Sequence, residues 1–135
     1  MKFSRNVMAA VLLDTNIVIY LFKKEKKYVD FVENYGEENI GISVVTYMEV
    51  LVGAKNDREE SLIQGLIDRF EIIPLTVSVA RDCAAWIRKR RQKSLRHPGF
   101  SDAVIGQTAL ALGTPLATNN PKDFAAFKEL TVVVP

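Results

Sequence analysis

Short runs that are wholly or almost wholly apolar alternate along this chain with longer segments whose apolar residues recur every three to four positions. Residues 9–13 (AAVLL) and 40–44 (IGISV) are of the first kind, and residues 16–24 and 28–35 are of the second. A short, continuously apolar run is typical of a strand buried on both faces of a parallel sheet, and the longer spacing is typical of a helix. Strands that alternate with helices predict an α/β fold with a mainly parallel central sheet.

The same reading extends over the rest of the chain. Further strands are expected at residues 71–75, 115–118 and 131–134. Further helices are expected at residues 46–54, 57–70, 76–95 and 102–112, with a short one near residues 123–127. The spacing places Leu62, Leu66 and Phe70 on one face of the second of these helices, and Val79, Cys83 and Ile87 close to one stripe of the third. The expected helix N-caps are Thr46, Asp57 and Ser101, and Gly113 is the expected end of the last long helix.

Length and composition describe one ordinary globular domain. With 135 residues, of which 48% are apolar, the chain can bury its own core. We expect residues 1–8 to be a flexible lead-in and residues 9–135 to be the folded domain. Cys83 is the one cysteine, so it forms no internal disulfide and is expected to be buried as a small apolar side chain. The apolar run at residues 7–13 ends at Asp14, too soon for a signal peptide or a membrane span, so a cytoplasmic protein without a membrane anchor is expected.

Four acidic residues fall at or near the carboxyl ends of expected strands: Asp14, Glu49, Asp102 and Asp123. Binding and catalytic sites in open parallel sheets form outside those strand ends, so the four side chains are expected at one edge of the sheet. Carboxylates that gather in one place repel each other unless a cation joins them. An all-oxygen set of ligands favours Mg²⁺ or Mn²⁺.

Each acid taken alone also has a purely structural reading. Asp14 suits the N-cap of the following helix, and Glu49 suits the second half of a capping box that begins at Thr46. Asp102 suits a first helical turn, where the helix dipole favours an acid, and Asp123 suits an exposed surface. The one histidine, His97, is expected in a surface loop rather than as a general base, and without Cys/His ligand spacing a zinc site is not expected.

Positive charge is concentrated in one part of the chain. Residues 83–101 contain no acid and carry Arg88, Lys89, Arg90, Arg91, Lys93 and Arg96. One reading is a solvated helix face with long side chains. The other is contact with the phosphate backbone of a nucleic acid, which positions the substrate without reading its sequence. The run leads towards Asp102, which favours the second reading. A smaller basic cluster at residues 23–27 (KKEKK) is read as a solvated turn.

The segments around the acids resemble the motifs of the PIN-domain ribonucleases. LLDTNIVIYLF at residues 12–22 resembles the first motif, in which a strand-end Asp is followed by Thr or Ser and by Asn. SVVTYMEVLVGA at residues 43–54 resembles the second motif, and FSDAVIGQTALALGTPLATNNPKDF at residues 100–124 resembles the third and fourth read together. The order and spacing match over nearly the whole chain. The short length and the NNPKDF ending are most like the toxins of VapBC systems.

This resemblance implies a single PIN-like domain that acts as a metal-dependent endoribonuclease, with in-line attack of a metal-activated water on RNA. It implies that Asp14, Glu49 and Asp102 bind the metal and that Asp123 is the fourth catalytic acid. The residues that would support the site are Thr15, Asn16, Thr46, Asn119 and Asn120. The residues that would bind RNA are Arg88, Arg90, Arg91, Lys93 and Arg96.

The resemblance also implies Mg²⁺ or Mn²⁺ as the cofactor, a cognate antitoxin as partner, and a homodimer. Residues 17–22 and 47–52 carry more apolar surface than a simple core needs, and a groove between them would receive an amphipathic antitoxin helix. Two alternatives stay open. One is a PIN nuclease for RNA processing or one acting on DNA. The other is a non-enzymatic, receiver-like α/β binding module, which fits less well because the second acid lies inside a helix.

Overall fold

The computed structural model describes residues 7–96 and 99–135. At its centre is a five-stranded sheet in the order β3-β2-β1-β4-β5, in which every pair of neighbours is parallel. The strands are β1 (Val11–Leu13), β2 (Ile40–Ser43), β3 (Glu71–Ile73), β4 (Leu116–Ala117) and β5 (Val132–Val133). The expected α/β fold with a parallel sheet is therefore confirmed. His97 lies outside the described residues, as does most of the expected lead-in at residues 1–8, so both readings stay predictions.

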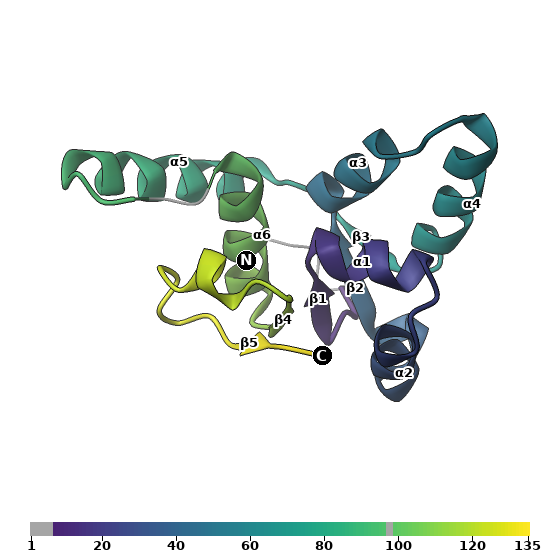
Figure 1. The fold of residues 1–135 in the computed structure, drawn as a ribbon. Helices are drawn as coiled ribbons and strands as arrows, with labels where there is room; N and C mark the ends of the chain where they lie inside the picture. Colours follow the sequence, from purple (N-terminus) through teal and green to yellow (C-terminus); the bar gives the residue numbers. More distant parts are fainter. Residues whose placement is uncertain (1–6, 97–98) are drawn as a thin grey trace.

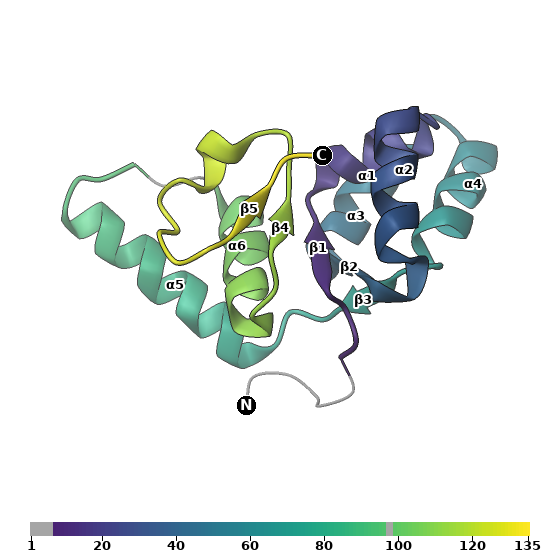
Figure 2. The same ribbon diagram turned by 90° about the horizontal axis from the view of Figure 1, so that it is seen from below.

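Helices cover the two faces of this sheet. In the described ranges they are α1 (Thr15–Phe22), α2 (Lys26–Tyr35), α3 (Val44–Val52), α4 (Asp57–Ile67), α5 (Val77–Gln92) and α6 (Phe100–Leu112), with short 3₁₀ helices η1 (Glu37–Asn39) and η2 (Pro121–Phe124). Figures 1 and 2 show α1 to α4 gathered on one side of β1 and α5 and α6 on the other. Every helix of the described residues is too short or too polar to span a lipid bilayer.

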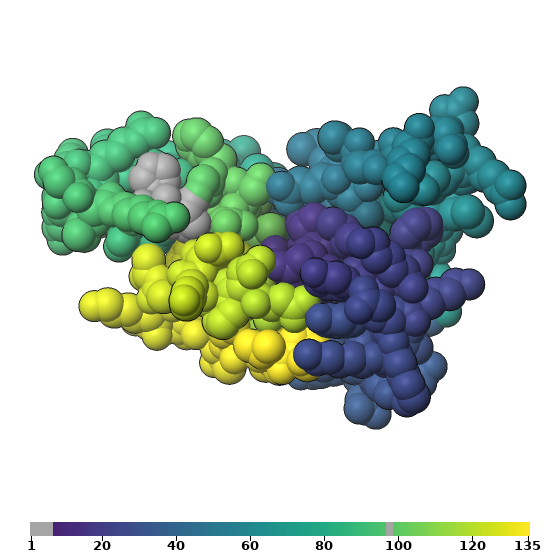
Figure 3. All heavy atoms as spheres, in the orientation of Figure 1, coloured from purple at the N-terminus to yellow at the C-terminus, as the bar shows by residue number. Residues whose placement is uncertain are grey.

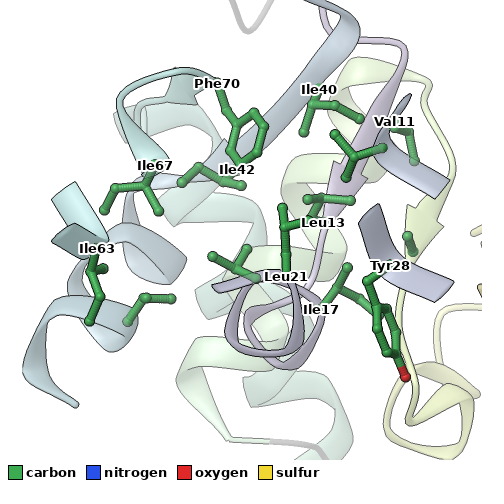
Figure 4. Close-up of a cluster of buried hydrophobic side chains, with 14 residues drawn as sticks. Val11, Leu13, Ile17, Leu21, Tyr28, Ile40, Ile42, Ile63, Ile67 and Phe70 are labelled. Carbon is green, nitrogen blue, oxygen red and sulfur yellow. The ribbon is translucent and has the colours of Figure 1, made fainter. Parts of the chain in front are cut away.

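Strand β1 shows how the sheet divides the core into two. Val11 and Leu13 belong to the cluster under α1, α2 and α4, which Figure 4 shows. Leu12, between them, packs into a second cluster under α5 and α6. All three side chains are fully buried, because successive side chains of a strand point to opposite faces and both faces are covered. The continuously apolar run in the sequence reflects this burial.

Three helix starts differ from the sequence reading. Ser43, not Thr46, is the N-cap of α3, since its hydroxyl accepts a hydrogen bond from the Val45 backbone N–H. Asn56, not Asp57, caps α4 by accepting from Glu59, and the N-cap of α6 is Gly99, not Ser101. Helices α3 and α6 therefore begin two residues earlier than expected, and α4 begins where expected but with the preceding residue as its cap. In each case a neighbouring residue already supplies the extended backbone or the acceptor that a cap needs. The capping-box reading of Glu49 is therefore wrong.

The buried stripes of the helices are mostly as expected. In α5 the side chains of Val79, Cys83 and Ile87 are buried, and Gly113 ends α6 in the left-handed conformation. Helix α4 is the exception, because its apolar spacing predicts Leu62 on the buried face. Ile63 and Ile67 are buried there instead, and Leu62 is 57% exposed. The expected short helix near residues 123–127 is η2, which lies at Pro121–Phe124.

The order of the strands fixes where a site can form. From β1 the chain moves through β2 to β3 in one direction, and then returns to the other side of β1 to form β4 and β5. The carboxyl ends of β1 and β4 therefore flank the point where the winding direction changes. Open α/β sheets bind their ligands at such a point. Asp14 directly follows β1, and Thr118 directly follows β4.

Candidate active site

Asp14 is the most enclosed of the four acids, with 5% of its surface exposed. It is the N-cap of α1, as one sequence reading expected: its Oδ1 accepts a hydrogen bond from the Thr15 backbone N–H at 2.8 Å. Its Oδ2 accepts from the Thr118 hydroxyl at 2.7 Å and from the Asn16 amide nitrogen at 3.3 Å. These contacts tie the carboxylate to β4 as well as to its own helix, so its orientation is fixed.

Glu49 lies on α3 and is linked to the start of α1. The hydroxyl of Thr15 donates to Glu49 Oε1 at 2.7 Å and lies 3.2 Å from the hydroxyl of Thr46. Thr46 is fully buried one helical turn before Glu49, whereas Glu49 itself is exposed. The predicted supporting residues Thr15 and Thr46 therefore lie beside the predicted acid, and the glutamate is accessible to a ligand.

The loop after β4 closes over Asp14. The backbone N–H of Asn119 donates to the side-chain oxygen of Asn16 at 3.3 Å, and the backbone N–H of Asn120 donates to the Thr118 hydroxyl at 3.0 Å. Because the Asn16 oxygen is occupied in this way, its amide nitrogen faces Asp14. Residues 118–120 therefore hold Asp14 both directly and through Asn16.

Asp102 and Asp123 join this group through their charges. Asp102 lies in the first turn of α6, where burial, and then the charges of Asp14, Asp123 and Glu49, raise its pKa from an ordinary 3.8 to about 6. Burial also raises the pKa of Asp14, and the hydrogen bonds from Thr118 and Thr15 act in the opposite direction. The structure thus brings all four acids of the sequence analysis into one electrostatic neighbourhood.

The repulsion between these acids has no counter-ion among the described residues. The ion pairs formed within residues 7–96 and 99–135 are Lys26–Asp30 and Arg69–Glu37, and neither involves the four acids. A hard cation would relieve the repulsion, and four carboxylates are suitable donors for one. In the described part of the chain, no three His, Cys, Asp or Glu side chains are grouped closely enough to enclose an ion unaided. Since Mg²⁺ usually keeps several waters and takes one or two carboxylates, the donor set fits a partly hydrated ion.

Two residues of this neighbourhood were missed by the sequence reading. Thr118, the fully buried residue after β4, makes the shortest hydrogen bond to Asp14. Its place at the end of a buried strand was a signal that could have identified it. Tyr28 on α2 accepts a hydrogen bond from the Asn119 side chain at 2.8 Å. No local pattern could have identified it, because the two residues are 91 positions apart.

The basic residues of α5 and the following turn are mostly exposed. Arg88, Lys89, Arg91, Lys93 and Arg96 are exposed, and Arg90 is partly buried. Its guanidinium lies over the Trp86 ring, 5.2 Å from the centroid, and its Nε donates to the Arg96 backbone oxygen. Trp86 itself stacks on Phe127 with centroids 4.3 Å apart, so this indole has a partner within the fold. RNA binding by Arg88, Arg90, Arg91, Lys93 and Arg96 stays a prediction.

Comparison with known proteins identifies relatives over nearly the whole chain. A family model described as the PIN domain matches residues 11–130. The tRNA(fMet)-specific endonuclease VapC of Shigella flexneri is 29% identical over an alignment of 121 residues that covers 87% of this chain and 91% of that protein. The family match leaves no support for the receiver-like binding module considered from the sequence.

Solved structures of the same architecture include complexes. VapBC2 from Rickettsia felis, bound to a DNA fragment from their promoter, contains a chain that is 27% identical. The match covers 92% of this chain and 97% of that one, with a TM-score of 0.79. A toxin–antitoxin complex from Klebsiella pneumoniae contains a chain that is 32% identical. That match covers 91% of this chain and 95% of that one, with a TM-score of 0.72.

Proposed function

The chain belongs to the PIN domain family, and from this premise we propose that it is a metal-dependent endoribonuclease and the toxin of a toxin–antitoxin pair. Its relatives support the activity: one of them is named a tRNA-specific endonuclease. The target of this chain is proposed only as RNA.

One observation carries the proposal. Four carboxylates lie close together, one at the end of β1 and the others on α3, α6 and η2. Burial, and then the charges of the other three acids, raise the pKa of Asp102 to about 6. Such crowding lowers the free energy of unfolding. Without a bound cation, the protein would become more stable if one of the acids were replaced by a neutral residue. Crowded carboxylates at the switch point of an open sheet are what a site for a divalent cation and a phosphate needs.

The proposed roles follow from the contacts. Asp14, Asp102 and Glu49 are the proposed ligands of a partly hydrated Mg²⁺ or Mn²⁺, which they would hold directly or through its waters, and Asp123 is the proposed fourth acid. A bound cation would supply positive charge for the phosphoryl oxygens and would lower the pKa of a water. The chain itself holds the acids in place: Thr15 orients Glu49, and the loop at residues 118–120 orients Asp14, directly and through Asn16.

The basic residues of α5 are the proposed contact to the RNA backbone. Arg88, Arg91, Lys93 and Arg96 face solvent and form no ion pair with the described residues. Arg90 is held by Trp86 and by Arg96, so it would meet a phosphate with little loss of side-chain entropy. Contacts of this kind position a strand for cleavage without selecting its sequence.

The proposed antitoxin site is a groove between α1, α2 and α4. Its volume is about 510 Å³, and its apolar lining is Leu21, Phe22, Val29, Val32, Leu62, Leu66 and Phe70. Lys24, Glu33, Glu37 and Arg69 also line it. Leu21 and Phe22 belong to the segment 17–22 that was expected to line such a groove. The other walls come from α2 and α4 rather than from residues 47–52, because Tyr47 bonds to Asp68 and Leu51 packs into the core.

An amphipathic helix suits this groove, since its apolar face would cover the floor and its polar face would meet the charged side chains. Related toxin chains have been solved in complex with antitoxins, which supports this choice of occupant. A homodimer is also proposed, and it would cover some of the exposed apolar side chains, such as Val52, Val77 and Phe100. A cytoplasmic location is part of the same proposal.

The activity is tested with purified protein, a single-stranded RNA and a DNA strand of the same sequence. We expect cleavage of the RNA, its loss in excess EDTA, and its return with Mg²⁺ or Mn²⁺. Cleavage that continues in excess chelator would contradict the metal mechanism. Cleavage of the DNA alone would favour the DNA-acting alternative.

The partnership is tested by co-expression with the product of the adjacent small open reading frame. We expect a stable complex that cleaves RNA far more slowly than the free protein. A complex that cleaves as fast as the free protein, or no complex at all, would favour a housekeeping nuclease.

A further inference from the structure

Tyr28 on α2 is a buried residue whose hydroxyl lies at the edge of the candidate site. Its ring is 7% exposed, packs in the cluster under α1, and stacks on the Tyr20 ring with centroids 5.0 Å apart. Figure 4 shows the hydroxyl at the outer end of the ring, pointing away from the apolar side chains. A phenylalanine would meet the packing requirement equally well, so the packing alone gives the hydroxyl no purpose.

The hydroxyl is used by the loop that follows β4. Asn119 donates its side-chain amide to Tyr28 at 2.8 Å, and its backbone N–H donates to the side-chain oxygen of Asn16. Asn16 in turn donates to Asp14. A continuous line of hydrogen bonds therefore runs from α2 to the carboxylate. Figure 3 shows the chain after β4 lying against the region of α1 and α2.

The tyrosine is also well placed to act as a fixed point. Its ring is held between the core and Tyr20, and Lys27 lies over it, 5.7 Å from the centroid. Asn119 is a loop residue with no helix or strand of its own to fix it. A hydrogen bond between a loop and a rigid, buried ring restrains the loop, because the ring is already held in place by its own packing. The same loop leads into η2, which carries Asp123.

We propose that Tyr28 is a positioning residue for the reaction: its hydroxyl holds Asn119, and Asn119 keeps Asn16 and the loop at residues 118–120 against Asp14. This inference rests on the proposed function. Groups that hold the ligands of a metal site typically contribute about tenfold to a hundredfold to metal affinity or activity. Because Thr118 still bonds Asp14 directly after the tyrosine hydroxyl is removed, we expect the lower end of that range.

The test compares Tyr28→Phe with Tyr35→Phe, which removes a hydroxyl from the same helix at a ring that packs on Phe31. Cleavage of a single-stranded RNA gives kcat and KM, and calorimetric titration with Mn²⁺ alone gives the affinity of the protein for metal. For Tyr28→Phe we expect kcat about tenfold lower, KM within about twofold, and Mn²⁺ affinity about tenfold weaker. Both variants should stay folded, since neither loses packing, and Tyr28→Phe should unfold only a few degrees lower because it loses one hydrogen bond.

Asn119→Ala provides the second arm. If the tyrosine acts through Asn119, the double variant is no more impaired than Asn119→Ala alone. Losses that multiply in the double variant would overturn the proposal, and so would a Tyr28→Phe protein with the kcat and Mn²⁺ affinity of Tyr35→Phe. If the wild-type protein binds Mn²⁺ but cleaves no RNA, the proposed function fails. The Mn²⁺ titrations then still decide the role of Tyr28.

Discussion

Replacing Asp102 by Asn should make the protein more stable at neutral pH while removing its activity. The pKa of Asp102 lies at about 6, raised from an ordinary 3.8 first by burial and then by three neighbouring acids. Between these two values the folded protein binds more protons than the unfolded chain, so stability rises as the pH falls through this window. Above pH 6 Asp102 is charged in both the folded and the unfolded chain, so the whole cost of holding its charge at this position lowers the stability of the fold. Asparagine has the same shape and no charge, so it removes this cost.

The size of the effect follows from the shift. A difference of about 2.2 units between 3.8 and about 6 corresponds to about 3 kcal/mol. Because the side chain is only half-buried and water screens it, about 1 kcal/mol of this is expected to remain. For a domain of this length, that is a rise in Tm of about 3–5 °C.

The assay is thermal unfolding of the wild type and of Asp102→Asn in chelator at pH 7.5 and at pH 4. We expect the variant to be the more stable at pH 7.5 and the two proteins to converge at pH 4, where Asp102 is protonated. Glu129→Gln, at an exposed acid outside the site, is the control and should change Tm little at either pH. If Asp102→Asn is no more stable than the wild type at pH 7.5, the acids do not repel each other as described. Added Mg²⁺ should stabilise the wild type more than the variant.

Three further predictions concern other parts of the chain. Replacing Arg90, Arg91 and Lys93 together by Gln should weaken binding to all RNA sequences alike. The plot of log binding constant against log salt concentration should flatten by about 0.7 units of slope for each phosphate that the protein no longer neutralises. An unchanged slope in filter binding would mean that these residues form only a solvated helix face. Leu66→Glu in the floor of the groove should prevent co-purification with the antitoxin while leaving RNA cleavage intact, and a normal complex would place the partner elsewhere. Gly106→Ala should destabilise the fold by about 1–3 kcal/mol in urea unfolding, because the added methyl carbon would lie 2.7 Å from the Phe127 ring; unchanged stability would mean that this ring moves freely.

The elements and the four acids could be predicted from the sequence because both depend on local patterns. The run at residues 9–13 is apolar at every position, which is typical of a buried strand. Asp14 follows this run directly, so the edge of the sheet at which Asp14 lies was also predictable. The resemblance to PIN-domain motifs then selected Glu49, Asp102 and Asp123 from the other acids of the chain.

The errors have physical reasons. Helix starts were misplaced because a residue that can cap a helix often has a neighbour that caps it better, as Ser43 does before Thr46. The position of Leu62 was misjudged because two adjacent apolar stripes run along α4, Leu62–Leu66 and Ile63–Ile67, and only tertiary packing decides that the second faces the core. The link from Tyr28 to Asn119 joins residues 91 positions apart and depends on the order of the strands, which no local pattern contains.

The central claim is that the four acids form one catalytic site, and the activity of Asp14→Asn tests it most directly. Asparagine is as good an N-cap as aspartate and has the same size, so the fold should be kept. The measurement is the rate of RNA cleavage by the wild type and by Asp14→Asn at saturating Mg²⁺, with unfolding temperature as the check on folding. We expect a folded variant whose rate is lower by about two orders of magnitude or more. A folded Asp14→Asn protein that cleaves RNA at the wild-type rate would contradict it.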